Sequence, residues 1–98
     1  MSYNDIVTED QRLVILRSLK EAPGGKSNDS MLHKMLGIWG HHISRDKVKS
    51  HLYWLAEMEL LEVETILSTD VVKITSRGFD VAEGSASVPG VATPRPGA

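Results

Sequence analysis

A stretch of basic and hydroxyl side chains near the middle of the chain has the chemistry to contact another molecule. Residues 44–55 contain three Lys and Arg side chains against the single acid Asp46, a net charge of 3 − 1 = +2. Cationic side chains pair with phosphate oxygens, and hydroxyl groups donate to phosphates or to base edges. The candidates for nucleic-acid contact are therefore Ser44, Arg45, Lys47, Lys49, Ser50 and Tyr53.

The four histidines, His33, His41, His42 and His51, are a second group with possible chemistry, as metal ligands. His41 and His42 are adjacent and point in different directions, and no pair has the H-x₃-H spacing that puts two ligands on one helix face. The chain also contains no Cys to complete a site. We expect surface or half-buried imidazoles, no metal site and no cofactor.

Catalytic motifs are missing from the sequence. It contains no phosphate-cradling glycine loop, no H-E-x-x-H pattern and no Cys nucleophile, and the Gly24-Gly25 pair is better explained as a hinge in a loop. Ser, His and Asp all occur, but no motif singles out a triad. We expect that the protein is not an enzyme.

Length and composition limit the architecture and the partners. A chain of 98 residues with 41% hydrophobic content supports one core. Eleven Lys and Arg against 13 Asp and Glu leave a net charge of −2, so nucleic-acid binding requires a local basic surface. The first residues lack the pattern of a signal peptide, and no apolar run approaches the roughly 20 residues of a membrane span. We expect a cytoplasmic protein with no membrane partner.

The spacing of apolar residues predicts the elements that position the candidate residues. Period-3.6 patterns predict helices over 9–21, 29–38, 44–59 and 76–83, and alternation around residues 61–74 predicts a β-hairpin. Thr8 and Gln11 form a capping-box pattern at the first helix, Ser44 is the N-cap of the third, and Gly84 ends the last. Residues 26–29 are expected to form a loop that contains the second N-cap. The leucines expected to be most buried are Leu16, Leu36, Leu52 and Leu55.

Three local patterns resemble the winged helix-turn-helix domains of ArsR- and MarR-like regulators. Residues 44–55 resemble their recognition helix, with the pattern S-x-x-x-V-x-x-x-L-x-x-L. Residues 58–63 look like the G-L-V segment that leads into the wing, except that Glu59 replaces the usual Gly, and residues 74–82 are similar to the L-T-x-x-G-x-x-x-A that follows it. The length, the opening and the tail also resemble small ArsR-like winged-helix proteins encoded in Mu-like prophages.

The resemblance implies an α+β winged helix-turn-helix fold over residues 1–84, with three helices, a β-hairpin wing and a short C-terminal helix. It further implies a phage- or prophage-type transcriptional regulator whose recognition helix, 44–59, enters the major groove of double-stranded DNA. The wing argues against tight binding, because residues 61–84 carry five acids and two bases, a net charge of −3, and its tip has no Lys or Arg.

An alternative is a winged-helix adaptor that binds a protein partner without specific DNA binding. Trp39, Tyr53 and Trp54 would then form an aromatic surface of the kind that interfaces favour. The competing explanation is that both Trp side chains are partly buried in the core, which is common at helical spacing. DNA binding and protein binding therefore both stay open at this point.

The tail, residues 85–98, is rich in Ala, Ser, Val, Pro and Gly and has the composition of a disordered segment. If it is ordered, we expect Val88 and Val91 to insert into a groove, more readily on a second subunit than on this small domain. We expect a homodimer whose seam involves the first helix and the tail, because regulators of this shape bind two half-sites as dimers.

Overall fold

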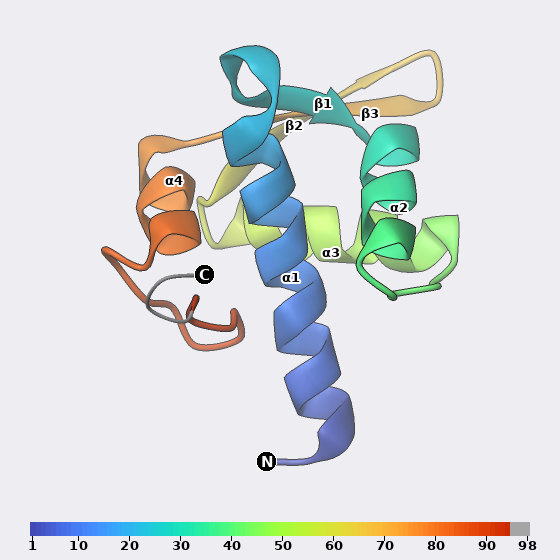
Figure 1. Cartoon of the computed structure of the whole chain (residues 1–98). Helices are drawn as coiled ribbons and strands as arrows, with labels where there is room; N and C mark the ends of the chain where they lie inside the picture. The colour runs from blue at the N-terminus through green and yellow to red at the C-terminus, as the bar shows by residue number, and fades with distance from the viewer. Residues whose placement is uncertain (95–98) are drawn as a thin grey trace.

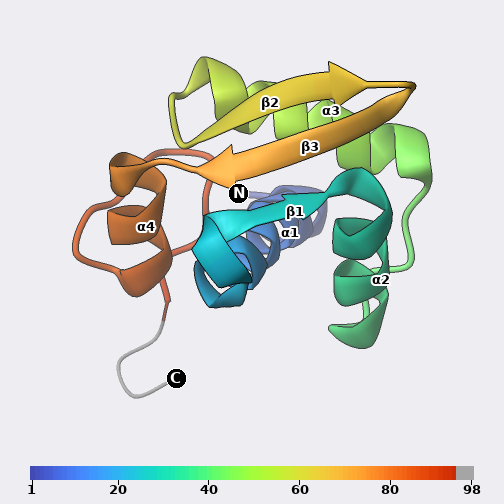
Figure 2. The same ribbon diagram turned by 90° about the horizontal axis from the view of Figure 1, so that it is seen from above.

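The computed structural model describes residues 1–94, which form a mixed α+β domain with four α-helices and a three-stranded antiparallel sheet. The elements are α1 (Tyr3–Glu21), the short 3-10 turn η1 (Pro23–Gly25), β1 (Lys26–Asn28), α2 (Asp29–Ile38), α3 (Arg45–Glu57), β2 (Leu61–Ile66), β3 (Thr69–Ile74) and α4 (Ser76–Glu83). α1 runs through the middle of the molecule, α2 and α4 lie on either side of it, α3 crosses behind it, and the sheet covers one end (Figures 1 and 2). Within residues 1–94, each helix is too short or too polar to span a membrane.

α1 begins six residues before the predicted start, so the prediction that Thr8 caps it is wrong. The cap is Ser2, whose Oγ accepts a hydrogen bond from the Asp5 N–H at 3.1 Å, while the Asp5 carboxylate accepts from the Ser2 N–H at 3.2 Å. This reciprocal pair is a capping box at an earlier place in the chain. Thr8 and Gln11 lie inside a helix that is already running, where their backbone N–H groups have helical partners.

β1 is a strand in a stretch that was predicted to be a loop. It pairs antiparallel with β3, with Ser27 opposite Val72, so that β3 lies in the centre of the sheet order β1-β3-β2. A strand of three residues has too short a pattern to be recognised, and its pairing partner lies more than 40 residues away. The N-cap expected in this stretch is confirmed as Asn28, which accepts from the Met31 N–H at 2.8 Å.

The end of α3 and the segment that connects it to the hairpin differ in detail from the expectation. α3 ends at Glu57, and Glu59 takes the left-handed conformation, φ +62°, at the position where the resembling proteins have Gly. The strands meet at a two-residue turn, Leu67 and Ser68, both with positive φ. The turn places Leu67 in solvent, 95% exposed. The predicted last helix, with Gly84 in the left-handed conformation at its end, is confirmed.

The core lies between the helices and the inner face of the sheet. The four leucines predicted to be most buried, Leu16, Leu36, Leu52 and Leu55, are all fully buried. Ser50 is exposed, which confirms the expected register of α3. The inward positions of β3 alternate, and Val72 packs into the same core.

Residues 85–94 pack on the chain's own domain. Val88 and Val91 are buried in the main core, so the expectation that they insert into a second subunit is wrong. The Trp54 ring packs against the same core, and Gly90 of the tail lies directly against the ring. The Ala92 N–H donates to the Glu9 carbonyl at 3.1 Å. The remainder of the predicted tail, residues 95–98, lies outside the described residues.

A polar cluster between α1 and α3 holds this tail in place. The Arg12 guanidinium stacks 3.8 Å from the Trp54 ring centroid, donates to the Gly90 carbonyl at 3.0 Å and donates to His51 Nδ1 at 3.3 Å. Nε2 of His51 therefore carries the proton and donates to the Gln11 carbonyl oxygen at 2.8 Å. Burial, together with the nearby Arg12 charge, lowers the pKa of His51 to about 4, so this imidazole is neutral at neutral pH.

Candidate nucleic-acid interface

Three of the candidate residues, Ser44, Lys47 and Ser50, lie exposed at the start of α3. Ser44 is the N-cap, and its Oγ accepts from the Lys47 N–H at 3.0 Å, so this hydroxyl serves the helix itself. The side chains of Lys47 and Ser50 are exposed. Within residues 1–94 neither side chain makes an ion pair or a hydrogen bond. These two are available to an external ligand.

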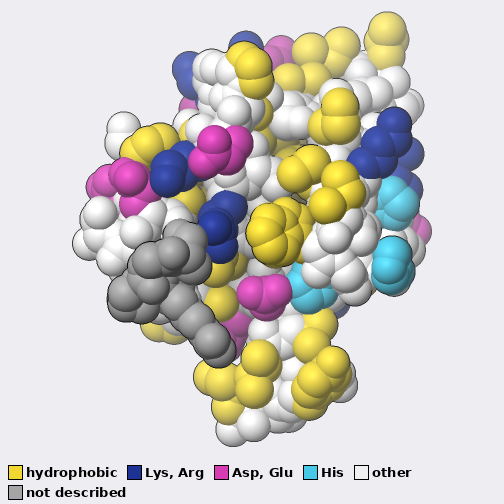
Figure 3. Space-filling model, in the orientation of Figure 1, with side chains coloured by type: hydrophobic (Ala, Val, Ile, Leu, Met, Phe, Trp, Pro, Cys, Tyr) yellow, Lys and Arg dark blue, Asp and Glu magenta, His cyan; other side chains and the backbone are white. Residues whose placement is uncertain are grey.

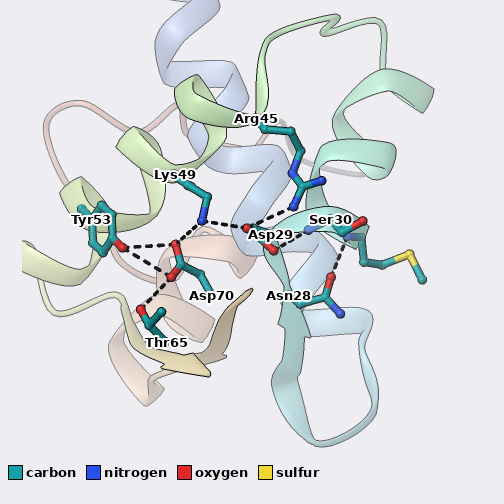
Figure 4. Close-up of polar contacts among 9 residues, drawn as sticks. Asn28, Asp29, Ser30, Arg45, Lys49, Tyr53, Thr65 and Asp70 are labelled. Atoms are coloured by element: carbon teal, nitrogen blue, oxygen red, sulfur yellow. Dashed lines mark hydrogen bonds and ion pairs between the residues drawn. The ribbon is translucent and has the colours of Figure 1, made fainter. Parts of the chain in front are cut away.

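Arg45 and Lys49 instead turn toward a buried carboxylate at the start of α2. Asp29 is fully buried; Lys49 Nζ lies 3.1 Å and Arg45 3.3 Å from its Oδ2 (Figure 4). The Ser30 N–H donates to the other oxygen, Oδ1, at 2.8 Å. A buried charge needs such partners, because an unpaired carboxylate in the interior costs several kcal/mol.

A second buried carboxylate joins the hairpin to the same helix. Asp70, at the start of β3, accepts hydrogen bonds from Thr65 Oγ1 at 2.8 Å and from the Tyr53 hydroxyl at 3.2 Å. Lys49 Nζ donates to Asp70 Oδ2 at 3.3 Å and so bridges the two aspartates (Figure 4). α2, α3 and the hairpin are thereby tied together at one point, which we call the Lys49 bridge: Asp29, Arg45, Lys49, Tyr53, Thr65 and Asp70.

The protonation of this cluster follows from its geometry. Burial acts to raise the pKa of Asp29, but contacts with Lys49, Arg45 and the Ser30 N–H outweigh it and hold the pKa below its usual range. The contact with Asp29 raises the pKa of Lys49; partial burial opposes this, and the bond to Asp70 adds to it. Both partners of this ion pair are therefore charged at neutral pH.

The local charge of the α3 surface is smaller than the sequence of α3 alone indicates. The three cations Arg45, Lys47 and Lys49 face Asp46 on the same helix and the two aspartates of the Lys49 bridge, a balance of 3 − 3 = 0. The structure keeps the six candidates together on α3 and its N-cap, but commits Arg45, Lys49 and Tyr53 to internal contacts. The Arg45 side chain is still half exposed.

Asp29, Thr65 and Asp70 were not among the candidate residues. Asp70 could have been found from the alternation of the strand, since it shares the inward-facing parity of Val72 and a buried Asp requires a cation. Asp29 offers no comparable local signal. Its burial depends on α3 packing across the start of α2, a contact between segments 16 to 20 residues apart.

The other candidate groups are dispersed. His33 Nε2 lies 2.8 Å from the Ile43 carbonyl, and His41 Nε2 lies 2.7 Å from the Asp10 carboxylate. In residues 1–94 no three His, Asp or Glu side chains come together in a way that could hold a metal ion. Trp39 is 59% exposed at the end of α2, whereas Trp54 is covered by Arg12 and the tail. The two Trp side chains therefore do not have one common environment.

Comparison with known proteins adds a relationship over nearly the whole chain. No family model matches the sequence, and no solved structure is significantly similar to it. A protein of Escherichia phage Mu, whose name is given as "Uncharacterized protein gp26", is 53% identical over 93 residues, which are 95% of this chain and 96% of the phage protein. The chain belongs to the gp26 family. An "Uncharacterized protein" of Haemophilus influenzae is 48% identical over 66 residues, 67% of this chain and 64% of that protein.

Proposed function

We propose that this member of the gp26 family is a winged helix-turn-helix protein that binds double-stranded DNA through α3, as a phage-type transcriptional regulator. The order of three helices, hairpin and short last helix agrees with the resemblance to ArsR- and MarR-like regulators. The observation that carries the proposal is the Lys49 bridge. It holds the hairpin at a fixed place beside α3, while Lys47 and Ser50 on the same helix stay uncovered.

These contacts give the residues of α3 two different roles in the proposed binding, direct contact with DNA and positioning of the hairpin. Lys47 supplies an exposed cation for a phosphate, and Arg45, which stays half exposed while it pairs with Asp29, can offer a second. Ser50 lies one turn further along, where a hydroxyl can donate to a phosphate or a base edge. Lys49 and Tyr53 act indirectly, by orienting the hairpin through Asp70. The small local charge predicts modest affinity that depends on salt.

The experiment is a binding series against the DNA upstream of the gene for this protein, with the salt concentration varied. Lys47→Glu should weaken binding and reduce the slope of log K against log salt by about one or more units, because at least one phosphate contact is lost. Lys26→Glu is the matched control, since Lys26 is also exposed but lies on β1. Equal losses for both variants would indicate nonspecific attraction, and no binding of the wild-type protein at low salt would contradict the proposal.

A second candidate function is an adaptor that binds another protein. It is favoured by the exposure of Ile38 and Trp39, 75% and 59%, at the end of α2. Aromatic anchors of this kind are enriched at interfaces. The same binding series separates the two functions, because an adaptor would not bind the DNA at any salt concentration.

A further inference from the structure

One face of α1 carries a stripe of residues that extends beyond the body of the molecule. The stripe follows alternating spacings of three and four residues: Tyr3, Ile6, Asp10, Leu13 and Arg17. This spacing keeps the residues on one side of a helix and is the spacing of helix pairs that pack along a seam. The first two turns project from the domain (Figure 1), and there Tyr3 is 79% and Ile6 53% exposed.

Further along α1, the same face forms the floor of a groove. The groove has a volume of about 1020 Å³ and includes Leu13, Val14 and Arg17 of α1. Its walls come from α2 and from the α4 side of the domain: Met31, Met35 and Trp39, and Ala82, Glu83 and Pro94. Figure 3 shows hydrophobic side chains gathered in this part of the face and again at the projecting end of the molecule.

The α1 stripe carries two charged side chains of opposite sign, Asp10 nearer the start of the helix and Arg17 nearer its end. The first half of α1 carries Asp5, Glu9 and Asp10, and the acid on the groove face is Asp10. The second half places Arg17, Lys20 and Glu21 on the groove lining, and Lys20 pairs with Glu83 of α4 at 3.6 Å, so within residues 1–94 the unpaired cation of the stripe itself is Arg17. Two such helices laid antiparallel bring Asp10 of each against Arg17 of the other, and the helix dipoles then also run in opposite directions, which is favourable.

We propose that the groove is occupied by α1 of a second copy of this chain, laid antiparallel along the α1 stripe. The projecting turn of each copy then enters the walled part of the other, where Tyr3 and Ile6 lie against the end of α1 and pack beside Met31. Asp10 of each copy lies beside Arg17 of the other. The contact is self-complementary, as a two-fold interface requires. It lies on the side of α1 away from α3, so α3 remains uncovered (Figure 2).

The first test is the mass of the full chain in solution, by sedimentation or light scattering across a range of concentrations. Ile6→Glu should raise the dissociation constant of the dimer about 30-fold or more, the loss expected for an interface hot spot. Ile66→Glu is the matched control, since Ile66 is 48% exposed but lies on the hairpin. A wild-type chain that is monomeric at every concentration, or equal effects of the two variants, would overturn the proposal.

The second test examines the pairing of Asp10 with Arg17 by charge exchange. Asp10→Arg and Arg17→Asp should each be monomeric alone, because each puts like charges opposite one another at both ends of the seam. Mixed in equal amounts, the two variants should form heterodimers, because the two substituted side chains attract each other at one end and the two native side chains do so at the other. Asp10→Arg also removes the 2.7 Å contact with His41, so circular dichroism of each variant checks folding before mixing. A folded mixture that stays monomeric would exclude the antiparallel arrangement.

Discussion

At the scale of single residues, Lys49 is the candidate side chain that contacts both buried carboxylates of the Lys49 bridge. Its ammonium group meets Asp29 at 3.1 Å and Asp70 at 3.3 Å, and both carboxylates are fully buried. Two carboxylates near one another repel unless a cation lies between them. The residue that looks like a phosphate contact in the sequence is therefore a structural cation in the fold.

Lys49→Met should lower the free energy of unfolding at neutral pH several times more than Lys47→Met, because it leaves two buried aspartates without their shared cation. Lys47→Met is the matched control on the same helix and should change stability by under about 0.5 kcal/mol, since Lys47 is exposed. Chemical denaturation measures both, and equal effects would show that the Lys49 bridge contributes no stability.

The pH dependence of the same pair of variants has a definite sign. The folded-state pKa of Asp29 is lowered, so its contribution is present above the unfolded pKa, about 4, and is lost as pH falls through the folded value. The pKa of Lys49 is raised, so its contribution is present below about 10.4 and is lost as pH rises through the folded value. The deficit of Lys49→Met should therefore shrink as the solution is made more acidic than about pH 4.

At the scale of elements, residues 85–94 pack across α1 and α3, and we call this segment the strap. Its valines enter the core, and Arg12 fastens the Gly90 carbonyl while stacking on Trp54. Gly90 has a φ of +98°, and a Cβ there would lie 2.7 Å from the Trp54 ring. Both the backbone conformation and the close approach of the ring require glycine at this position.

Gly90→Ala should destabilise the protein by about 2–3 kcal/mol, of which about 1 kcal/mol is the cost of a side chain at positive φ. Gly24→Ala supplies the control, because Gly24 also has a positive φ, +68°, but has open space around its Cβ position. Thermal unfolding compares the two. If Gly24→Ala is as costly as Gly90→Ala, the strap does not depend on contact with Trp54.

At the scale of the whole molecule, the two proposed surfaces lie on opposite sides of α1. The groove opens on the side seen in Figure 1, and α3 crosses behind α1. An interface on one side does not cover the other. A dimer formed through α1 would present its two α3 helices on outer faces.

Ile6→Glu, which should break the dimer, is therefore expected to leave the salt slope for one short duplex unchanged within about half a unit, because each α3 meets that duplex by itself. Fluorescence anisotropy with a labelled duplex measures this slope for the wild-type protein and the variant. A slope that falls by half in Ile6→Glu would mean that both copies contact one duplex, in conflict with the arrangement of the two faces.

The sequence by itself determined the features that repeat within a few residues. The spans of α2 and α4, the hairpin, the Ser44 cap and the burial of Leu16, Leu36, Leu52 and Leu55 were all predicted correctly. Periodicity and capping express local backbone geometry, which the neighbouring residues specify. The start of α1 was missed even so, since two capping boxes lie six residues apart and the earlier one is used.

Only the tertiary structure decided the features that join distant segments. β1 forms because β3 offers it an edge, and residues 85–94 pack on the domain because their valines enter the core and Arg12 and Trp54 contact Gly90. Lys49 is committed to Asp29 and Asp70, which lie 20 and 21 residues away on either side. Such contacts depend on where the fold brings buried charge and apolar surface together; the alternation of β3 can indicate that Asp70 is buried, but not which cation it meets. For this reason the net charge around α3 can be counted only when the fold has placed Asp29 and Asp70 beside Lys49.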